Sequence, residues 1–232
     1  MTIAVMQPYF FPYIGYFQMI NAVDRFVIFD DVNYINKGWI NRNNILVNGK
    51  PNKITVPLKE ASQNKLIRDI FLSDDQKGID KIGKTIEMSY KKAPFFGNVF
   101  SFIHDCISAK TGSISEYNTK ILRATCSYLD IRTAFVSTSS VYNNTSLQAQ
   151  ERILDICAKE NADEYINAIG GMELYSKELF RERNVRLKFI KAKPVVYKQS
   201  GNEFVPWLSM IDILMFNSPE QINEMLNQYE LF

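Results

Sequence analysis

The chain of 232 residues has the length of one compact domain, or of a domain with a helical insertion. With 46% hydrophobic residues it can build a sizeable core, whereas its formal net charge of +2 and the lack of a lysine–arginine run argue against duplex nucleic acid as a partner. No apolar stretch approaches the roughly 18 residues of a membrane span, and the chain opens on a strand-like segment rather than a leader, so we expect a cytoplasmic protein without a membrane span. Its three widely spaced cysteines and single histidine favour free thiols in a reducing compartment, and we expect no metal site.

The first thirty or so residues predict a strand–helix–strand unit. Residues 3–6 form an apolar strand, Pro8 and Pro12 forbid helix in the loop that follows, and apolar positions from Phe17 to Val23 predict a helix before a second strand at 26–29. Ligands of such units bind near the loop between the first strand and the first helix. The candidate substrate- or nucleotide-binding residues of this loop are Gln7, Tyr9, Tyr13, Gly15 and Tyr16. The alternative is an aromatic plug that packs the first strand against its neighbours.

Two acids end the second strand. Asp30 and Asp31 would point toward the ligand crevice if the sheet is parallel, because the carboxyl ends of parallel strands line it. A carboxylate there can act as a proton acceptor, so both acids are candidate catalytic residues. The alternative is an ordinary turn acid or helix cap.

An asparagine-rich loop follows and carries the best polar constellation of the chain. Lys37 and Arg42 can bind phosphate, Trp39 can stack on a sugar or a base, and Asn41 and Asn43 supply paired donors and acceptors. We therefore interpret these five residues as substrate- or nucleotide-binding. The alternative is a solvated loop in which the asparagines serve turn geometry.

The rest of the chain predicts a hairpin, a helical block and a return to alternation. Asn48-Gly49 between two β-rich runs predicts a hairpin, and the pattern is helical from about 74 to 130. Strands at 133–137, 164–167 and 185–190 then alternate with helices, the first at 148–160 and the second opened by Gly170-Gly171 and running to about 183. This order predicts an α/β, Rossmann-like fold, with residues 1 to about 60 and 131–192 in one sheet with a parallel core and helices on both faces. A final helix is predicted to start at Ser218-Pro219.

A third candidate group follows the late strand at 164–167. Asn167, Gly170 and Gly171 would lie at the same crevice edge as the first loop, and glycines that open a helix leave backbone N–H groups free for an anion. The alternative is a strand-to-helix turn that needs glycine only for its backbone conformation.

Several segments resemble one protein family, the WbqC-like proteins, over nearly the whole chain. The matching stretches are Met6-Gln7-Pro8-Tyr9-Phe10-Phe11-Pro12-Tyr13-Ile14-Gly15-Tyr16, Phe29-Asp30-Asp31-Val32, Lys37-Gly38-Trp39-Ile40-Asn41-Arg42-Asn43, Tyr90-Lys91-Lys92-Ala93-Pro94, Tyr165-Ile166-Asn167 with Gly170-Gly171, and residues 209–217. The resemblance implies a single domain over residues 1–232 and a role in bacterial surface-polysaccharide (O-antigen) biosynthesis. It further implies a transferase that moves glycine or another aminoacyl group to an amino sugar or sugar nucleotide, in association with other polysaccharide-assembly enzymes.

Tyr13-Ile14-Gly15-Tyr16 also has the layout of the His-x-Gly-His signature of nucleotidyltransferases and class I aminoacyl-tRNA synthetases. Both histidine positions hold tyrosine, which donates hydrogen bonds but carries no positive charge near neutral pH. The signature implies a nucleotidyltransferase-like sheet and a nucleotide, ATP or a sugar nucleotide, as ligand. Two alternatives to the transferase therefore stay open, a nucleotidyl- or adenylyl-transferring enzyme and a non-catalytic sugar-nucleotide-binding or scaffold protein.

Overall fold

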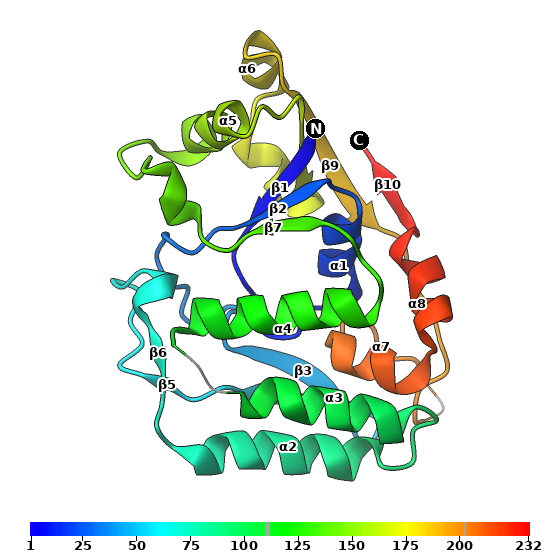
Figure 1. The fold of residues 1–232 in the computed structure, drawn as a ribbon. Coiled ribbons are helices and arrows are strands. Elements are labelled where there is room, and N and C mark those ends of the chain that lie inside the picture. Colours follow the sequence, from blue (N-terminus) through cyan, green and yellow to red (C-terminus); the bar gives the residue numbers. More distant parts are fainter. Residues whose placement is uncertain (110–111, 202) are drawn as a thin grey trace.

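The computed structural model describes residues 1–109, 112–201 and 203–232 and is built on one central sheet (Figure 1). Six strands follow one another in the order β10-β9-β8-β1-β2-β7. Their bounds are β1 Thr2–Met6, β2 Arg25–Ile28, β7 Ala134–Val136, β8 Glu164–Ala168, β9 Arg186–Ala192 and β10 Tyr229–Leu231. Neighbouring strands are parallel except for β10, which pairs antiparallel with β9. The predicted α/β fold with a mostly parallel sheet is thus confirmed.

The two faces of the sheet enter two separate apolar cores. On β1, Ile3 and Val5 belong to one core and Ala4 between them to the other, as the two-residue period of a strand requires. The helices of the first core are α5 Ala149–Lys159 and α6 Lys177–Glu182. Those of the second include α1 Ile14–Asn21, α4 Ile114–Tyr128, α7 Met210–Phe216 and α8 Pro219–Leu226, and this core continues into the helical block described next. Helices therefore cover both faces, as predicted.

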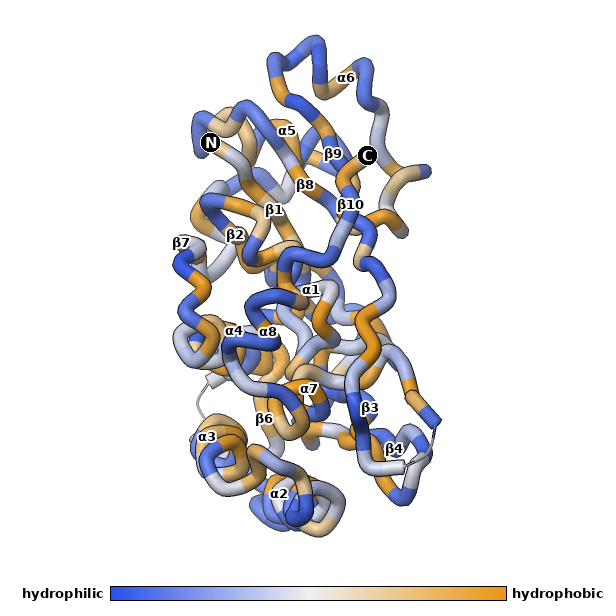
Figure 2. The backbone as a smooth tube through the Cα atoms, turned by 90° about the vertical axis from the view of Figure 1, so that its right-hand side faces the viewer, coloured by the Kyte–Doolittle hydropathy of each residue, from blue (hydrophilic) through white to orange (hydrophobic). Residues whose placement is uncertain are grey.

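The predicted helical block between the sheet's two halves is present. It consists of α2 Gln76–Tyr90, α3 Phe96–Ser108 and α4, and α2 and α3 lie at the end of the molecule away from the sheet (Figures 1 and 2). Local signals start these helices: the Asp75 side chain caps α2, and Ser113 and Glu116 form a capping box at α4. That the block is an insertion into a single domain stays a prediction.

The predicted hairpin forms around Asn48-Gly49, whose φ angles of 50° and 75° suit the turn. It consists of β3 Arg42–Val47 and β4 Lys50–Thr55, and β5 Leu58–Lys59 pairs with β6 Phe71–Leu72 in a second small sheet. Both pairs are separate from the central sheet, so the prediction of one sheet through residue 60 is wrong for this part. The physical reason is that β3 packs against α2 and α7, while β4 is almost fully exposed and carries Pro51.

The segment after β8 also differs from its prediction. Gly170 and Gly171 lie in a 3₁₀ helix, η3 Ile169–Leu174, and a separate helix α6 begins at Lys177 with Ser176 as its cap. The two other 3₁₀ helices are η1 Ile67–Asp69 and η2 Ser139–Tyr142. At the C-terminal end, the predicted helix start is confirmed, with Pro219 in the first turn and a capping box between Ser218 and Gln221.

The strand order places a switch point between β1 and β8. From β1 the chain adds β2 and β7 on one side, and then crosses over to add β8 and β9 on the other. Ligands of open parallel sheets bind outside the carboxyl ends of the strands at such a point. Of the helices that the structure describes, none has both the length and the apolar character needed to cross a membrane.

Candidate functional site

A cavity of about 380 Å³ opens at the switch point. Its walls come from the carboxyl end of β1, the loop after it, the start of α1, the β8–η3 junction and the end of β9. The lining residues are Met6, Tyr9, Tyr13, Gly15, Tyr16, Met19, Ala168, Ile169, Gly170, Ile190, Lys191, Ala192 and Trp207. A volume of this size lies in the range of small-molecule sites, and its mixture of aromatic rings, backbone and one lysine is typical of such sites.

The loop after β1 is held in place by buried polar side chains from distant segments. The Asn43 amide donates to the carbonyls of Phe10 and Phe11 at 3.1 and 2.7 Å. The Asn118 amide donates to the Pro8 carbonyl at 3.0 Å, and the Ser209 hydroxyl donates to the Phe11 carbonyl at 2.7 Å. These bonds satisfy backbone groups that two prolines and a left-handed Phe11 (φ 39°) leave without strand or helix partners.

The aromatic residues of this loop divide into two sets with different roles. Phe10 and Phe11 are fully buried and anchor the loop in the core, as the plug alternative expects. Tyr9 and Tyr13 lie half-buried at the cavity, and Tyr16 closes its floor with its hydroxyl donating to the Gln7 carbonyl at 2.7 Å. The loop is thus both a plug and a cavity wall, and the hydroxyl-bearing rings form the wall.

Gly15 leaves room for the ring of Tyr13. Tyr13 is the N-cap of α1, and its ring folds over Gly15, where an added Cβ would lie 2.8 Å from the Tyr13 Cζ atom. The Tyr13-Ile14-Gly15-Tyr16 segment therefore starts the first helix after the first strand, the place that the His-x-Gly-His layout implies. Its side chains at the two signature positions are neutral rings.

The tyrosines of the cavity stay protonated well beyond neutral pH. Burial raises the pKa of Tyr13, and burial together with Tyr13 raises the pKa of Tyr9. Complete burial holds the pKa of Tyr16 well above its ordinary value. These groups can donate hydrogen bonds but supply no charge, so the cationic group of this cavity is Lys191, at the end of β9.

Trp207 is the main residue that the sequence analysis missed. Its ring packs edge-on against Tyr13 with centroids 5.7 Å apart, and it keeps a left-handed backbone (φ 61°) while being 69% exposed. Together Tyr13 and Trp207 border two further cavities: one of about 220 Å³ that Tyr9, Trp39 and Asn43 also line, and one of about 360 Å³. The sequence does contain a feature that could have marked Trp207 as a candidate binding residue. It is one of only two tryptophans of the chain, and it follows a proline in a loop.

Seven of the predicted binding residues therefore lie around these connected cavities. They are Tyr9, Tyr13, Gly15, Tyr16 and Gly170 at the switch point, and Trp39 and Asn43 beside it. Asn43 lines the cavity of about 220 Å³, but its amide donates to the Phe10 and Phe11 carbonyls of the loop. An added Cβ at Gly170 would meet open space, so this residue leaves room at the cavity edge.

The predicted catalytic acids have a different environment. Asp30 is 3% exposed and accepts hydrogen bonds from Ser115 and Thr138, each at 2.7 Å. Asp31 is equally buried, accepts from the Ser139 hydroxyl and forms an ion pair with Arg152, whose Nη2 lies 2.5 Å from its Oδ2. Neither acid lines the three cavities, and these contacts favour a structural role. Their catalytic role stays a prediction without support from this geometry.

The remaining loop residues mostly bind the loop itself. The Asn41 amide donates to the Val56 carbonyl at 2.9 Å and its carbonyl accepts from Tyr34, while the Arg42 Nε donates to the Gly38 carbonyl at 2.8 Å. Lys37 is exposed with a left-handed backbone. These contacts fit the solvated-loop alternative, and a phosphate role for Lys37 or Arg42 stays a prediction.

Asn167, Gly171 and Gln7 lie next to the cavity rather than in its lining. The Asn167 side-chain oxygen accepts from the Ala168 backbone N–H at 2.8 Å, and an added Cβ at Gly171 would lie 2.7 Å from the Asn167 side-chain nitrogen. Gln7 contributes its backbone carbonyl to Tyr16. All three shape the edge of the cavity, and a direct ligand role for them stays a prediction.

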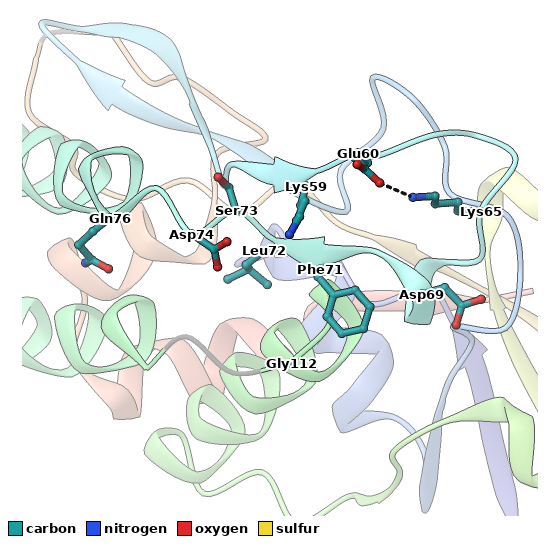
Figure 3. Close-up of a pocket in the computed structure, with 10 residues that line it drawn as sticks. All are labelled: Lys59, Glu60, Lys65, Asp69, Phe71, Leu72, Ser73, Asp74, Gln76 and Gly112. Carbon is teal, nitrogen blue, oxygen red and sulfur yellow. Dashed lines mark ion pairs between the residues drawn. The ribbon is translucent and has the colours of Figure 1, made fainter.

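A larger surface pocket of about 700 Å³ lies elsewhere, between the β5–β6 strands and the start of α2 (Figure 3). Its charged side chains come in both signs, and Glu60 and Lys65 pair with each other at 3.5 Å across its rim. The predicted site residues all lie outside its lining. Size alone thus does not identify the site, whereas topology and aromatic lining favour the switch-point cavity.

The fold and site define an α/β protein with a candidate ligand cavity at the switch point of a Rossmann-like sheet. The profile of the WbqC-like protein family matches residues 7–224, and the chain belongs to this family. A protein of Mycobacterium tuberculosis named Uncharacterized protein Rv1507c is 27% identical over 215 residues, which cover 91% of this chain and 92% of the relative. No solved structure matches the chain significantly. The family is associated with polysaccharide-related functions.

Proposed function

We propose that this protein binds a nucleotide or sugar nucleotide in the switch-point cavity and acts in bacterial surface-polysaccharide biosynthesis. The observation that carries the proposal is the position of the cavity, between the carboxyl ends of β1 and β8 with Gly15 and Tyr16 of α1 in its wall. The rings of Tyr13 and Trp207 offer faces on which a base or sugar can stack. Lys191 is placed to meet a phosphate.

The reaction that we propose is transfer of glycine or another aminoacyl group to an amino sugar or sugar nucleotide. Family membership supports this pathway, and the aromatic rings and the Tyr9 and Tyr13 hydroxyls of the cavity suit catalysis by positioning of the two reactants. In such a transfer the amine nitrogen attacks the activated carbonyl carbon, the leaving group departs with the electron pair of the broken bond, and the proton that the amine loses passes to the leaving group or to water.

One observation favours an alternative without turnover. Asp30 and Asp31 are both sequestered by protein partners, and the cavity wall consists of tyrosines, a tryptophan, aliphatic side chains and one lysine. These features also suit a sugar-nucleotide-binding protein that serves another enzyme of polysaccharide assembly. A test of function must therefore separate binding from turnover.

The two tryptophans provide the test, because both lie at the cavities. Trp39 and Trp207 are the whole tryptophan content of the chain, so fluorescence excited selectively at tryptophan reports on this region alone. We expect ATP or a uridine-diphosphate sugar to change the fluorescence saturably, and the change to shrink in Trp207→Phe more than in Trp39→Phe. Incubation of the bound nucleotide with glycine and an amino sugar, followed by mass spectrometry, then detects transfer or pyrophosphate release. Absence of any saturable change with both nucleotide classes would refute the proposal.

A further inference from the structure

A second cavity, with a volume of about 360 Å³, is also lined by the Tyr13–Trp207 ring pair. The chain between the end of β9 and the start of α7 contributes most of its wall, and α1 and α7 contribute the rest. Its apolar lining includes Ile14, Val195, Phe204, Pro206, Leu208 and Ile213. The switch-point cavity adjoins this one, since Tyr13, Trp207, Lys191 and Ala192 line both.

The charged residues of this second cavity are lysines. Lys191 and Lys193, two positions apart at the end of β9, both line it, and Lys191 lines the switch-point cavity as well. Lys193 lies 3.6 Å from Glu230 in an exposed ion pair, which water screens strongly. Lys191 forms no ion pair within the described ranges of the chain. An apolar cavity with two lysines at its mouth is complementary to an anion that carries an apolar body.

The wall of the second cavity is fixed by a buried polar network. Asp212 of α7 is fully buried and accepts hydrogen bonds from the Tyr197 hydroxyl at 2.6 Å and the Gln199 amide at 2.9 Å. Gln199 in turn bonds both backbone groups of Val205, at 2.8 and 3.0 Å. This network ties the segment that carries Phe204, Pro206 and Trp207 to the protein core, so the cavity is formed before a ligand arrives.

We infer that this cavity is a second ligand site, adjacent to the first, for an organic phosphate whose body is apolar. The apolar wall takes the body, and Lys191 and Lys193 take the phosphate at the boundary with the switch-point cavity. The two ligands would then meet at the ring pair. The inference rests on the proposed function only for the nature of the first ligand, because the second cavity and its lysines are independent of it.

Calorimetric titration with defined probes tests the inference. Farnesyl phosphate and 1-naphthyl phosphate present the same head group on a chain and on a ring, and farnesol lacks the phosphate. We expect one or both phosphates to bind the wild-type protein at least about tenfold more tightly than farnesol. A charge-assisted hydrogen bond contributes enough binding free energy for a difference of that size. Failure of both phosphates to bind would overturn the inference.

Matched variants then locate the binding. Val195→Phe places a larger side chain in the cavity wall, whereas Val196→Phe adds the same ring at the neighbouring, 71% exposed position outside the lining. We expect the first to weaken phosphate binding about tenfold and the second to leave it unchanged. Lys193→Met should weaken binding of the phosphates but not of farnesol, with the exposed Lys198→Met as its control. Equal effects of variant and control in either pair would overturn the inference.

A variant of the first cavity separates this inference from the proposed function. Ala168→Leu narrows the switch-point cavity, which Ala168 lines, and leaves the second cavity intact. We expect it to weaken binding of ATP or the sugar nucleotide while farnesyl phosphate binds as before. Organic phosphates that bind a protein inert to nucleotides would refute the proposed function alone, and the reverse result would refute the second site alone.

Discussion

The structure predicts that Asn43 is the residue on which the first loop depends most. Asn43 is 4% exposed, and its amide provides the only hydrogen bond described for the Phe10 carbonyl and one of two for the Phe11 carbonyl. Truncation in Asn43→Ala leaves the buried Phe10 carbonyl without a partner, which costs about 1–3 kcal/mol. The lost bond to Phe11 costs less, because Ser209 still donates to that carbonyl.

The expected total is a decrease of about 2–4 kcal/mol in the free energy of unfolding. For a chain of this size, that corresponds to a fall of roughly 5–15 °C in the melting temperature. The neighbouring Asn44→Ala is the control, since the contacts of Asn44 in the loop region use its backbone carbonyl, which accepts from the Ser209 N–H at 2.8 Å. Thermal and urea denaturation of the two variants measure the difference.

A double-mutant cycle gives the sharper form of this prediction. In Ser209→Ala the Phe11 carbonyl keeps Asn43, and in Asn43→Ala it keeps Ser209, but in the double variant it loses both. The two changes should therefore be more costly together than the sum of the single effects, by about 1–3 kcal/mol. Additive effects, or an Asn43→Ala protein as stable as Asn44→Ala, would refute this account of the loop.

Three further outcomes follow from the same contacts. Arg152→Met should destabilise the protein by about 3–5 kcal/mol in urea denaturation, because it leaves the buried Asp31 carboxylate without its ion-pair partner; a cost below 1 kcal/mol would contradict that reading. Gly15→Ala should weaken nucleotide binding in fluorescence titrations more than it lowers the melting temperature, because the new Cβ displaces the Tyr13 ring from the cavity wall; an unchanged affinity would contradict it. Burial raises the pKa of Asp212 above its ordinary value of 3.8, so the folded protein holds this proton more tightly and the group's contribution to stability falls as pH rises above that value. As the pH rises above 3.8, the wild-type protein should therefore lose stability relative to Asp212→Asn. Stability curves of the two proteins that run parallel with pH in denaturation experiments would refute the raised pKa of Asp212.

Local patterns allowed most of the fold to be predicted. Apolar runs and capping residues locate their own elements, which is why β1, the Asn48-Gly49 hairpin and α8 form where the sequence predicts them. The assembly of these elements depends on partners far along the chain, which local patterns do not contain. The hairpin is the clearest case, because its β3 strand packs on α2 and α7 rather than joining the central sheet.

The same limit explains which candidate residues lie at the cavity. Tyr13 and Gly15 owe their place to a local feature, the junction of the first strand and first helix, and they line the cavity as predicted. Asp31 and Asn43 have partners about 120 and 30 positions away, Arg152 and the loop carbonyls. A polar side chain that faces a distant backbone group has the same local sequence as one that faces a ligand, so sequence alone could not separate the two roles.

The distribution of charge around the ring pair bears on how any ligand is held. At the two signature positions, Tyr13 and Tyr16 have raised pKa values and stay neutral, and the Tyr16 hydroxyl already donates to the Gln7 carbonyl. The start of α1 therefore offers a ring face and the Tyr13 hydroxyl but no side-chain charge. The positive charge instead comes from Lys191 at the end of β9, which lines both cavities together with Tyr13 and Trp207. A phosphate-bearing ligand would therefore place its anionic group toward β9 and its ring system toward the Tyr13–Trp207 pair. Because Lys191 lines both cavities, that orientation brings the phosphate to the part of the wall that the two cavities share.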